Sequence, residues 1–507
     1  MSVATPLALR NPQAVDEAAI PVLPIQEFRD TVLHTVKGGA RLSAFFGRLI
    51  SGKQVKVYAL LAHDEVGECT AIGTIVQDSY PSLTPECPQA HWFERELAEQ
   101  FAVKPEGHPW FKPLRHHHNY RGVPDLWPGQ DFASPIPGSY PFFRVKGSEI
   151  HEVAVGPVHA GIIEPGHFRF QCHGERVLHL EIQLGYQHRG IERMLAGGPS
   201  QRMPVLAESI AGDTVVGHAL AFCEVMESLG DCQISPRAQA LRDIVLELER
   251  LANHIGDLGA LGTDVGFLPA AAYFGRLRGE FLNLLMELTG SRYGRSFLRP
   301  GGVLHDLSGV LLVDFEKRMK RAQKELRTFA RMLFDTPSVI DRFEGTGIVT
   351  REVSEELGFV GPVARACGSH RDVRHDHPSG IYQFAHLPMM TADTGDVHAR
   401  ALIRWLEAER SLEFLLEQLT SLPEGELQVP CARAGPNQWA FSMVEGWRGE
   451  IVHLITTNEL GAIARYKVID PSFHNWIGLA MALRDGEISD FPLCNKSFNL
   501  SYAGHDL

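Results

Sequence analysis

Residues 236–255 read PRAQALRDIVLELERLANHI, and this stretch decides the fold class of the chain. Its apolar residues recur at intervals of three and four, which places them on one face of an α-helix; they are Leu241, Ile244, Val245, Leu248, Leu251 and Ile255. Pro236 can occupy the first turn of such a helix, because the N–H that proline lacks has no partner there. The pattern predicts a long amphipathic helix.

Similar helical patterns cover residues 276–288, 315–334 and 397–419, so they predict a helical bundle as the core of this half. A β-rich stretch, 153–187, precedes the bundle, and the runs 451–455 and 464–468 predict a hairpin near the close. In the first hundred residues, strand-like runs at 55–61 and 71–76 and a short helix over 91–101 indicate a small α/β domain. The predicted fold class is α+β.

The chain divides into four regions by this pattern. Residues 1–24, with scattered prolines, are expected to form a flexible tail, and residues 25–105 the small domain. Residues 106–148 hold seven prolines and five glycines, too many for regular elements, and are expected to form an extended connector. Residues 149–507 form the large, mainly helical domain.

Composition excludes several classes of protein. Asp and Glu outnumber Lys and Arg by 61 to 48 in 507 residues, and a net charge of −13 repels a phosphate backbone, so nucleic acid is excluded as a partner. No window approaches the 18 or so apolar residues of a membrane span, and the N-terminus lacks the apolar core of a signal peptide. Any membrane association is expected to come through partner subunits.

The cysteines are spread singly along the chain, with no CxxC pair; they are Cys69, Cys87, Cys172, Cys223, Cys232, Cys367, Cys431 and Cys494. This spacing argues against a zinc ribbon or a cysteine-ligated iron–sulfur cluster. We expect free, mostly buried thiols.

Several short motifs, taken together, resemble one family. HWFERE at 91–96, FAV at 101–103 and EGHP at 106–109 resemble the small peripheral subunit of respiratory complex I. GPVHAG at 156–161 and GYQHRGIE at 185–192 resemble the opening motifs of the large subunit shared by complex I and nickel–iron hydrogenases. The resemblance continues through ERLANH at 249–254, RPGGV at 299–303, DVR at 372–374, RGE at 448–450 and DPSFHNW at 470–476. The fused order is similar to the large subunit of formate hydrogenlyase-type, energy-converting hydrogenases.

The ligands of a nickel–iron centre are the main departure from that family. Such a centre takes its soft thiolate ligands from two CxxC pairs. The matching stretches here are ESIAGDT at 208–214 and SFNLSYAG at 497–504, where Ala211, Thr214, Ser501 and Gly504 stand at the cysteine positions. The resemblance therefore implies that this chain holds no nickel–iron centre and no cofactor of its own, and is not itself an active hydrogenase.

If the family fold is kept, polar side chains converge where the metal would lie; these are Glu208, Asp213, Thr214, His218, Ser501 and His505. They form either a proton-relay pocket or a vestigial one filled by mutual hydrogen bonds. In the relay alternative, burial is expected to raise the pKa of Asp213 or Glu208 toward working pH.

A quinone pocket is the alternative that the resemblance to complex I implies for this site, because the large subunit of complex I binds a quinone headgroup with a histidine and a tyrosine. His159 and His167 are the histidine candidates here. The tyrosine position falls on Gly212, and no tyrosine occurs between Tyr186 and Tyr273, which argues against a quinone.

Charged residues crowd the short helix predicted over 91–101; they are Glu94, Arg95, Glu96 and Glu99. They form either a solvated surface face or a docking face between the two domains.

Two functions are compatible with this sequence. The first is a subunit of a membrane-anchored oxidoreductase complex of the NADH-quinone oxidoreductase or hydrogenase type, coupling electron transfer to ion translocation. The resemblance implies an iron–sulfur small subunit, a ferredoxin-like iron–sulfur subunit and antiporter-like membrane subunits as partners, on the cytoplasmic face of the inner membrane. The second is a non-catalytic scaffold that keeps the hydrogenase fold as a docking platform.

Overall fold

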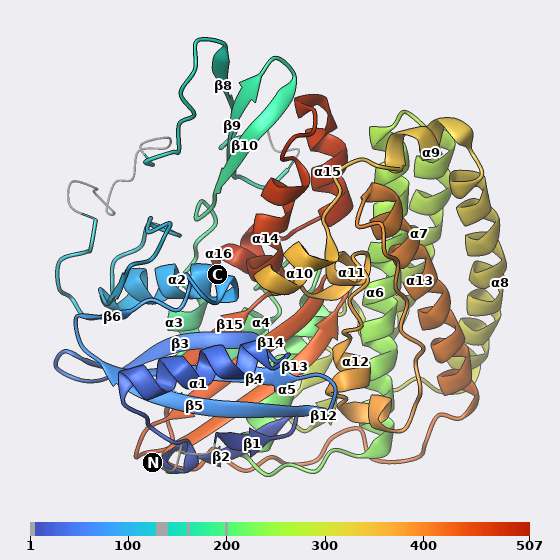
Figure 1. Ribbon diagram of the computed structural model, residues 1–507. Helices are drawn as coiled ribbons and strands as arrows, with labels where there is room; N and C mark the ends of the chain where they lie inside the picture. The colour runs from blue at the N-terminus through green and yellow to red at the C-terminus, as the bar shows by residue number, and fades with distance from the viewer. Residues whose placement is uncertain (1–5, 128–139, 160–162, 198–200) are drawn as a thin grey trace.

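The structure is a computed structural model that describes residues 6–127, 140–159, 163–197 and 201–507. Figure 1 shows an N-terminal sheet on one side of the molecule and a bundle of long helices on the other. The N-terminal sheet is antiparallel, in the order β1-β5-β4-β3. Its strands are β1 (Leu7–Leu9), β3 (Arg41–Ser51), β4 (Gln54–His63) and β5 (Glu68–Val76). Helix α1 (Ile25–Lys37) packs on β4 and β5, and α2 (His91–Phe101) packs on β3.

A second sheet, of order β15-β14-β13-β2, lies at the centre of the chain's fold and joins its two ends. Strands β13 (Gln438–Gly446), β14 (Gly449–Thr457) and β15 (Ile463–Ile469) come from the C-terminal part, and β2 (Gln13–Asp16) pairs antiparallel with β13. The prediction of a flexible tail over residues 1–24 is therefore wrong for residues 6–24. Both β1 and β2 lie in sheets, and η1 (Glu17–Ala19) follows.

The large region opens with a three-stranded sheet, as the β-rich stretch predicts. Its order is β10-β9-β8, and its strands are β8 (Ile150–Val155), β9 (His167–His173) and β10 (Arg176–Gln183). Before it come the short parallel pair β6 (Ser79–Pro81) and β7 (Lys104–Glu106) and the turn η2 (Pro88–Ala90). The described residues between Glu106 and Ile150 contain no helix or strand.

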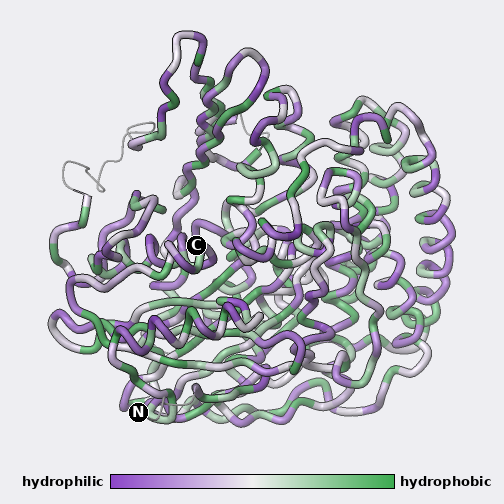
Figure 2. Tube along the Cα trace, viewed as in Figure 1, coloured by the Kyte–Doolittle hydropathy of each residue, from purple (hydrophilic) through white to green (hydrophobic). Residues whose placement is uncertain are grey.

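The bundle is formed by α6 (Pro236–Asp264), α7 (Leu268–Thr289), α8 (Gly309–Phe334) and α13 (Val397–Thr420), so the helical periodicity predicted its members correctly. Helix α6 begins at Pro236, and Ser235 caps it by accepting from the Ala238 N–H at 3.1 Å. In Figure 2, α8 at the edge of the bundle carries hydrophilic residues interrupted at intervals by hydrophobic ones. The α+β fold class is confirmed.

Shorter elements connect these layers and close the C-terminal part. Those before the bundle are α3 (Ile191–Leu195), α4 (Met203–Ala207) and α5 (Val215–Leu229). Those that follow α7 and α8 are β11 (Leu298–Arg299), β12 (Gly302–Val303), α9 (Pro337–Phe343), α10 (Arg351–Leu357), α11 (Gly361–Arg365), α12 (Val373–Asp376) and η3 (Gly380–Gln383). The last are α14 (Pro471–Ala482), η4 (Ile488–Asp490), α15 (Phe491–Phe498) and α16 (Tyr502–Asp506).

Helix α2 is buried between the two regions, which decides between the alternatives for its charged residues. Glu94, Arg95, Glu96 and Glu99 are all at most 3% exposed, so they do not form a surface face. Glu96 accepts from Lys467 Nζ of β15 at 2.7 Å. The helix is a docking face between the small and large regions.

A second buried ion pair crosses the same boundary. Arg41 on β3 donates to Glu450 on β14 at 2.6 Å, and both side chains are at most 5% exposed. Because an unpaired buried charge is costly, these pairs fix how the two regions sit against each other.

The prediction that every cysteine is a free thiol is wrong for two of them. Cys232 and Cys431 form a disulfide, whereas the remaining six are free and buried. Separately, no helix in the described part of the chain is long and apolar enough to cross a membrane.

Candidate functional site

An arginine–aspartate pair lies at the start of α5, where the sequence places the missing metal ligands. Arg448, in the tight turn between β13 and β14, donates to both carboxylate oxygens of Asp213, at 2.6 and 2.7 Å. Trp447 Nε1 donates to Thr214 Oγ1 at 3.1 Å, and the Arg448 guanidinium stacks 3.9 Å from the Trp447 ring centroid. The bidentate contact fixes both the position and the charge of Asp213.

This pairing reverses the titration expected for Asp213. Burial raises the pKa of its carboxyl, but the Arg448 guanidinium lowers it by more, so the pKa lies below its ordinary value. The expectation of a raised pKa at Asp213 is therefore wrong, because it did not include Arg448, which lies 235 residues away in the sequence and faces Asp213 only in the fold. Asp213 stays ionised at neutral pH and anchors Arg448.

A buried chain of hydrogen bonds runs from α5 into the central sheet. His218 Nε2 lies 3.0 Å from Asp470 Oδ2, and His218 Nδ1 lies 3.1 Å from His453 Nε2. His453 Nδ1 lies 2.8 Å from the hydroxyl of Tyr466. All four side chains are at most 1% exposed. They form an unbroken sequence of groups that can each pass a proton to the next.

The two ends of this series of hydrogen bonds differ in charge. Burial raises the pKa of Asp470, but its hydrogen bond to His218 and the charge of Arg448 lower it below its ordinary value. Burial holds the pKa of His453 well below the ordinary histidine value and that of Tyr466 well above the ordinary tyrosine value. The carboxylate end is therefore charged, whereas the sheet end is neutral.

The other two former ligand positions lie beside Asp470. Ser501 Oγ accepts from the Gly504 N–H at 2.8 Å, which caps α16. A Cβ on Gly504 would lie 2.5 Å from the Asp470 carboxyl group, so that carboxylate occupies the space a side chain would need. Together with Ala211 and with Thr214, whose hydroxyl is already hydrogen-bonded, these residues supply no soft anionic ligand and do not fit a nickel–iron centre.

Two predicted site residues turn away from this cluster. Glu208 accepts from Arg299 Nη1 at 3.0 Å and from the Ser296 N–H at 2.9 Å. His505 Nδ1 contacts Asp506 Oδ1 at 2.8 Å. The structure thus brings Asp213, Thr214, His218 and Ser501 together around Arg448 and Asp470, while Glu208 and His505 serve neighbouring contacts.

The histidines proposed for a quinone pocket lie at the β8–β9 hairpin. His159 Nε2 contacts the Gly166 carbonyl at 3.0 Å, and His167 is the first residue of β9. This hairpin reaches the site through Glu164, which accepts from the Tyr502 N–H at 3.1 Å. Burial raises the pKa of Glu164, and the nearby Asp213 carboxylate raises it further. The role of both histidines stays a prediction.

Glu249 on α6 is a titratable group beside the site that sequence reasoning missed. Its carboxylate accepts from the N–H groups of Val216 and Gly217, at 2.7 and 3.0 Å, and so binds the first turn of α5. Burial nevertheless raises its pKa to about 8. Glu249 is thus set to change charge near neutral pH, where Asp213 does not.

Sequence signals existed for some of the missed residues. Arg448 and Asp470 each open a motif, RGE and DPSFHNW, that carries the family resemblance, and Glu249 opens ERLANH. His453 and Tyr466 lie in strand-like runs, where their pairing depends on the register of β14 and β15. No local pattern marks that register.

Comparisons with known proteins show the family to which this chain is related. Two family profiles match, that of the respiratory-chain NADH dehydrogenase 30 Kd subunit over residues 41–126 and that of the 49 Kd subunit over residues 264–438. Formate hydrogenlyase subunit 5 of Escherichia coli (strain K12) is 29% identical over 495 residues, or 93% of this chain and 85% of that protein. The carbon monoxide-induced hydrogenase of Rhodospirillum rubrum is 30% identical over 69% of this chain and 97% of its own length.

The fold and site define a class, that of large subunits of multisubunit redox complexes fused to a small peripheral subunit. A chain from the membrane-bound sulfane sulfur reductase, described as an archaeal respiratory membrane complex, shares the fold, with a TM-score of 0.66, 24% identity and coverage of 71% of this chain and 99% of that one. This chain belongs to the family of the large subunits of membrane-bound hydrogenases and of respiratory-chain NADH dehydrogenase.

Proposed function

We propose that this chain is the large peripheral subunit of a membrane-anchored oxidoreductase complex that couples electron transfer to ion translocation. The observation that carries the proposal is its similarity, over nearly the whole chain, to formate hydrogenlyase subunit 5. The relatives are named as hydrogenase and dehydrogenase subunits, which favours this function over a scaffold that only docks other subunits.

The partners follow from the chemistry that this chain lacks. Its residues do not fit a nickel–iron centre, so electrons must be carried by other subunits. We expect an iron–sulfur small subunit and a ferredoxin-like iron–sulfur subunit, together with antiporter-like membrane subunits that move the ion. With these partners the chain would lie on the cytoplasmic face of the inner membrane.

Within this complex the buried site would handle protons. His218 can accept a proton while the Asp470 carboxylate balances its charge, and it can then pass one to His453 across their 3.1 Å contact. The low pKa of His453 prevents a second charge from accumulating deeper in the fold. Arg448 and Asp213 stay ionised before and after His218 takes up the proton, and their charges set the electrostatic field around Asp470.

Affinity purification tests the subunit assignment. The tagged chain, solubilised from native membranes with mild detergent, is expected to bring iron–sulfur and membrane subunits with it, and to be absent from the membrane fraction when it is expressed alone. A chain that binds membranes without partners, or that purifies from native membranes by itself, would overturn the assignment.

The proton role is tested separately, in the complex reconstituted into vesicles. Replacing His218 by Asn or Asp213 by Asn is expected to lower the number of ions moved per electron, while Asp213→Ala reports the added effect of lost packing. If this ratio is unchanged in all three variants of the intact complex, the site is a structural remnant.

A further inference from the structure

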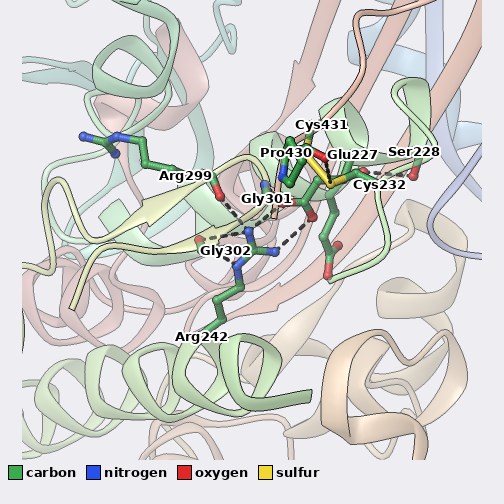
Figure 3. Close-up of a disulfide and its surroundings, with 10 residues drawn as sticks. Glu227, Ser228, Cys232, Arg242, Arg299, Gly301, Gly302, Pro430 and Cys431 are labelled. Carbon is green, nitrogen blue, oxygen red and sulfur yellow. Dashed lines mark hydrogen bonds and ion pairs between the residues drawn. A yellow bond between two sulfur atoms is a disulfide. The ribbon is translucent and has the colours of Figure 1, made fainter. Parts of the chain in front are cut away.

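The disulfide between Cys232 and Cys431 joins two segments that are far apart in the sequence. The two residues are 199 positions apart, with their Cα atoms 5.1 Å from each other. Cys232 lies in the turn between α5 and α6, and Cys431 lies in residues 421–437, which we call the strap because they cross from α13 to β13 without forming a helix. Figure 3 shows the bond at this crossing.

The first part of the strap is held by other contacts as well. The Val429 N–H donates to the Gly301 carbonyl at 2.9 Å, and the Val303 N–H donates to the Leu427 carbonyl at 2.9 Å. These contacts lay the strap on the β11–β12 hairpin. The hairpin is fixed in turn by Arg242, which donates to the Gly302 carbonyl at 3.0 Å (Figure 3).

The second part of the strap depends on the disulfide. Residues 430–434 lie outside every helix and strand of the described chain, and Pro430, Ala432 and Arg433 are exposed. The Ala432 carbonyl packs against Gly230, where a Cβ would lie only 2.5 Å away. The Cys232–Cys431 bond is the covalent contact that keeps this stretch on the α5–α6 turn.

This pair differs from the other cysteines in its exposure. Cys232 and Cys431 are half-buried, whereas the six free cysteines are buried. Burial raises the pKa of the free thiols, to about 12 at both Cys87 and Cys494, which leaves them poorly reactive. Thiol chemistry with molecules in solution is therefore directed to Cys232 and Cys431.

A cavity of about 350 Å³ opens beside the bond. Cys232 and Asp231 form part of its wall, and Glu224 and Asp243 face it from α5 and α6. The α5–α6 turn therefore forms part of this wall, and Cys232 belongs to both the cavity wall and the disulfide.

We propose that Cys232 and Cys431 are a thiol–disulfide exchange site for a reducing dithiol protein, and that the bond acts as a latch on the strap. In the forward step, one thiolate of the reductant attacks a sulfur of the pair and forms a mixed disulfide, while the released thiolate takes up a proton. The second thiol of the reductant then displaces the other cysteine. Two thiols remain on this chain, and the reductant leaves as a disulfide.

Reduction would free residues 430–434 while the hydrogen bonds at Leu427 and Val429 keep the first part of the strap in place. The strap would then open locally. Because α5 carries His218 near one end and leads to Cys232 at the other, the latch lies on an element of the candidate site. The inference does not depend on the proposed function, since it concerns the chemistry of the pair alone.

Arg433 makes the state of the latch measurable, because trypsin cleaves after exposed arginines in loose chain. The full chain in its purified complex is incubated with a thioredoxin-type protein in its reduced dithiol form or in its oxidised disulfide form. The free thiols of the chain are then trapped. Tryptic cleavage after Arg433 is followed by mass spectrometry. The native pair is expected to be reduced without unfolding, and cleavage to become about tenfold faster. Reoxidation is expected to restore the slow rate.

Variants distinguish the effect of breaking the disulfide from a general loosening of the fold. Cys232→Ser and Cys431→Ser are each expected to give the fast rate under both conditions, and Arg433→Gln to remove the fragment. A disulfide that resists the dithiol in the folded chain, or equal cleavage rates in the oxidised and reduced wild-type chain, would overturn the proposal. The wild-type comparison remains decisive even if a serine variant fails to fold.

Discussion

At the scale of single residues, the site is organised by the pairing of Asp213 with Arg448. The residue types around the lost metal could be read from the sequence, since the motifs align Ala211, Thr214, Ser501 and Gly504 with ligand positions. Which charges face one another could not be read, because Arg448 comes from a turn 235 residues away. In the structure, Asp213 is a fixed negative charge and not the proton carrier that the sequence predicted.

Replacing Asp213 by Asn tests this pairing. The variant leaves the Arg448 guanidinium without a carboxylate, and because the Asp213 side chain is 37% exposed, we expect the free energy of unfolding to fall by only about 1–3 kcal/mol. Urea unfolding measures the change. Asp485→Asn breaks the exposed Arg176–Asp485 pair and serves as the control, with an expected change within about 0.5 kcal/mol. Equal effects in the two variants would contradict the account.

Glu249 gives the fold a pH dependence of known sign. Its pKa is raised from 4.5 to about 8 in the folded chain. Between these two pH values the folded chain keeps the proton on Glu249, whereas the unfolded chain has released it. The free energy of unfolding is therefore highest below pH 4.5 and falls as the pH rises to about 8. Glu249→Gln is expected to make the free energy of unfolding less dependent on pH, by on the order of 5 kcal/mol over this range.

Unfolding by urea at a series of pH values measures that slope. The exposed Glu356, replaced by Gln, is the matched control and should leave the slope as in the wild-type chain. A Glu249→Gln variant with the wild-type slope would show that another group titrates in its place.

At the scale of elements, helices could be predicted better than strand pairing. The periodicity of residues 236–255 and the motif at 91–96 identified α6 and α2, because a helix is determined by residues close in sequence. Strand β2 was missed, since it is four residues long and its partner β13 lies more than 400 positions away. The Cys232–Cys431 bond was missed for the same reason.

The β11–β12 hairpin shows how closely one element depends on its glycines. Gly302 has φ of +149°, and a Cβ there would lie 1.9 Å from the Leu427 carbonyl oxygen. Gly302→Ala is therefore expected to push the strap away and to lower the free energy of unfolding by about 2–4 kcal/mol.

The control for that variant is Gly275→Ala, on an exposed part of α7 where a Cβ meets nothing within 4 Å. Alanine favours a helix over glycine, so this change is expected to stabilise by about 0.5–1 kcal/mol. A Gly302→Ala chain as stable as the wild type, in the same unfolding assay, would mean that the strap does not rest on this hairpin.

At the scale of the whole molecule, the small and large regions form one structure. The fold class and the order of the regions could be predicted from local patterns and motifs. How the two regions pack together could not be predicted, because this packing rests on β2 and on the buried ion pairs Arg41–Glu450 and Glu96–Lys467, which join distant segments. Residues 1–148 and 149–507, expressed separately, are each expected to fail to fold, since each would expose unpaired charges.

Circular dichroism and thermal unfolding of the two pieces, alone and mixed, measure this dependence. A cooperative transition in either piece alone would show that the boundary contacts are dispensable. The intact chain is expected to unfold in one transition.

We propose that this chain serves a membrane redox complex without a nickel–iron centre of its own. Elemental analysis of the complex purified through this chain from native membranes tests it most directly. We expect iron, carried by the partner subunits, and no stoichiometric nickel, because Ala211, Thr214, Ser501 and Gly504 offer no soft ligand. Nickel in a one-to-one ratio with this chain would contradict it.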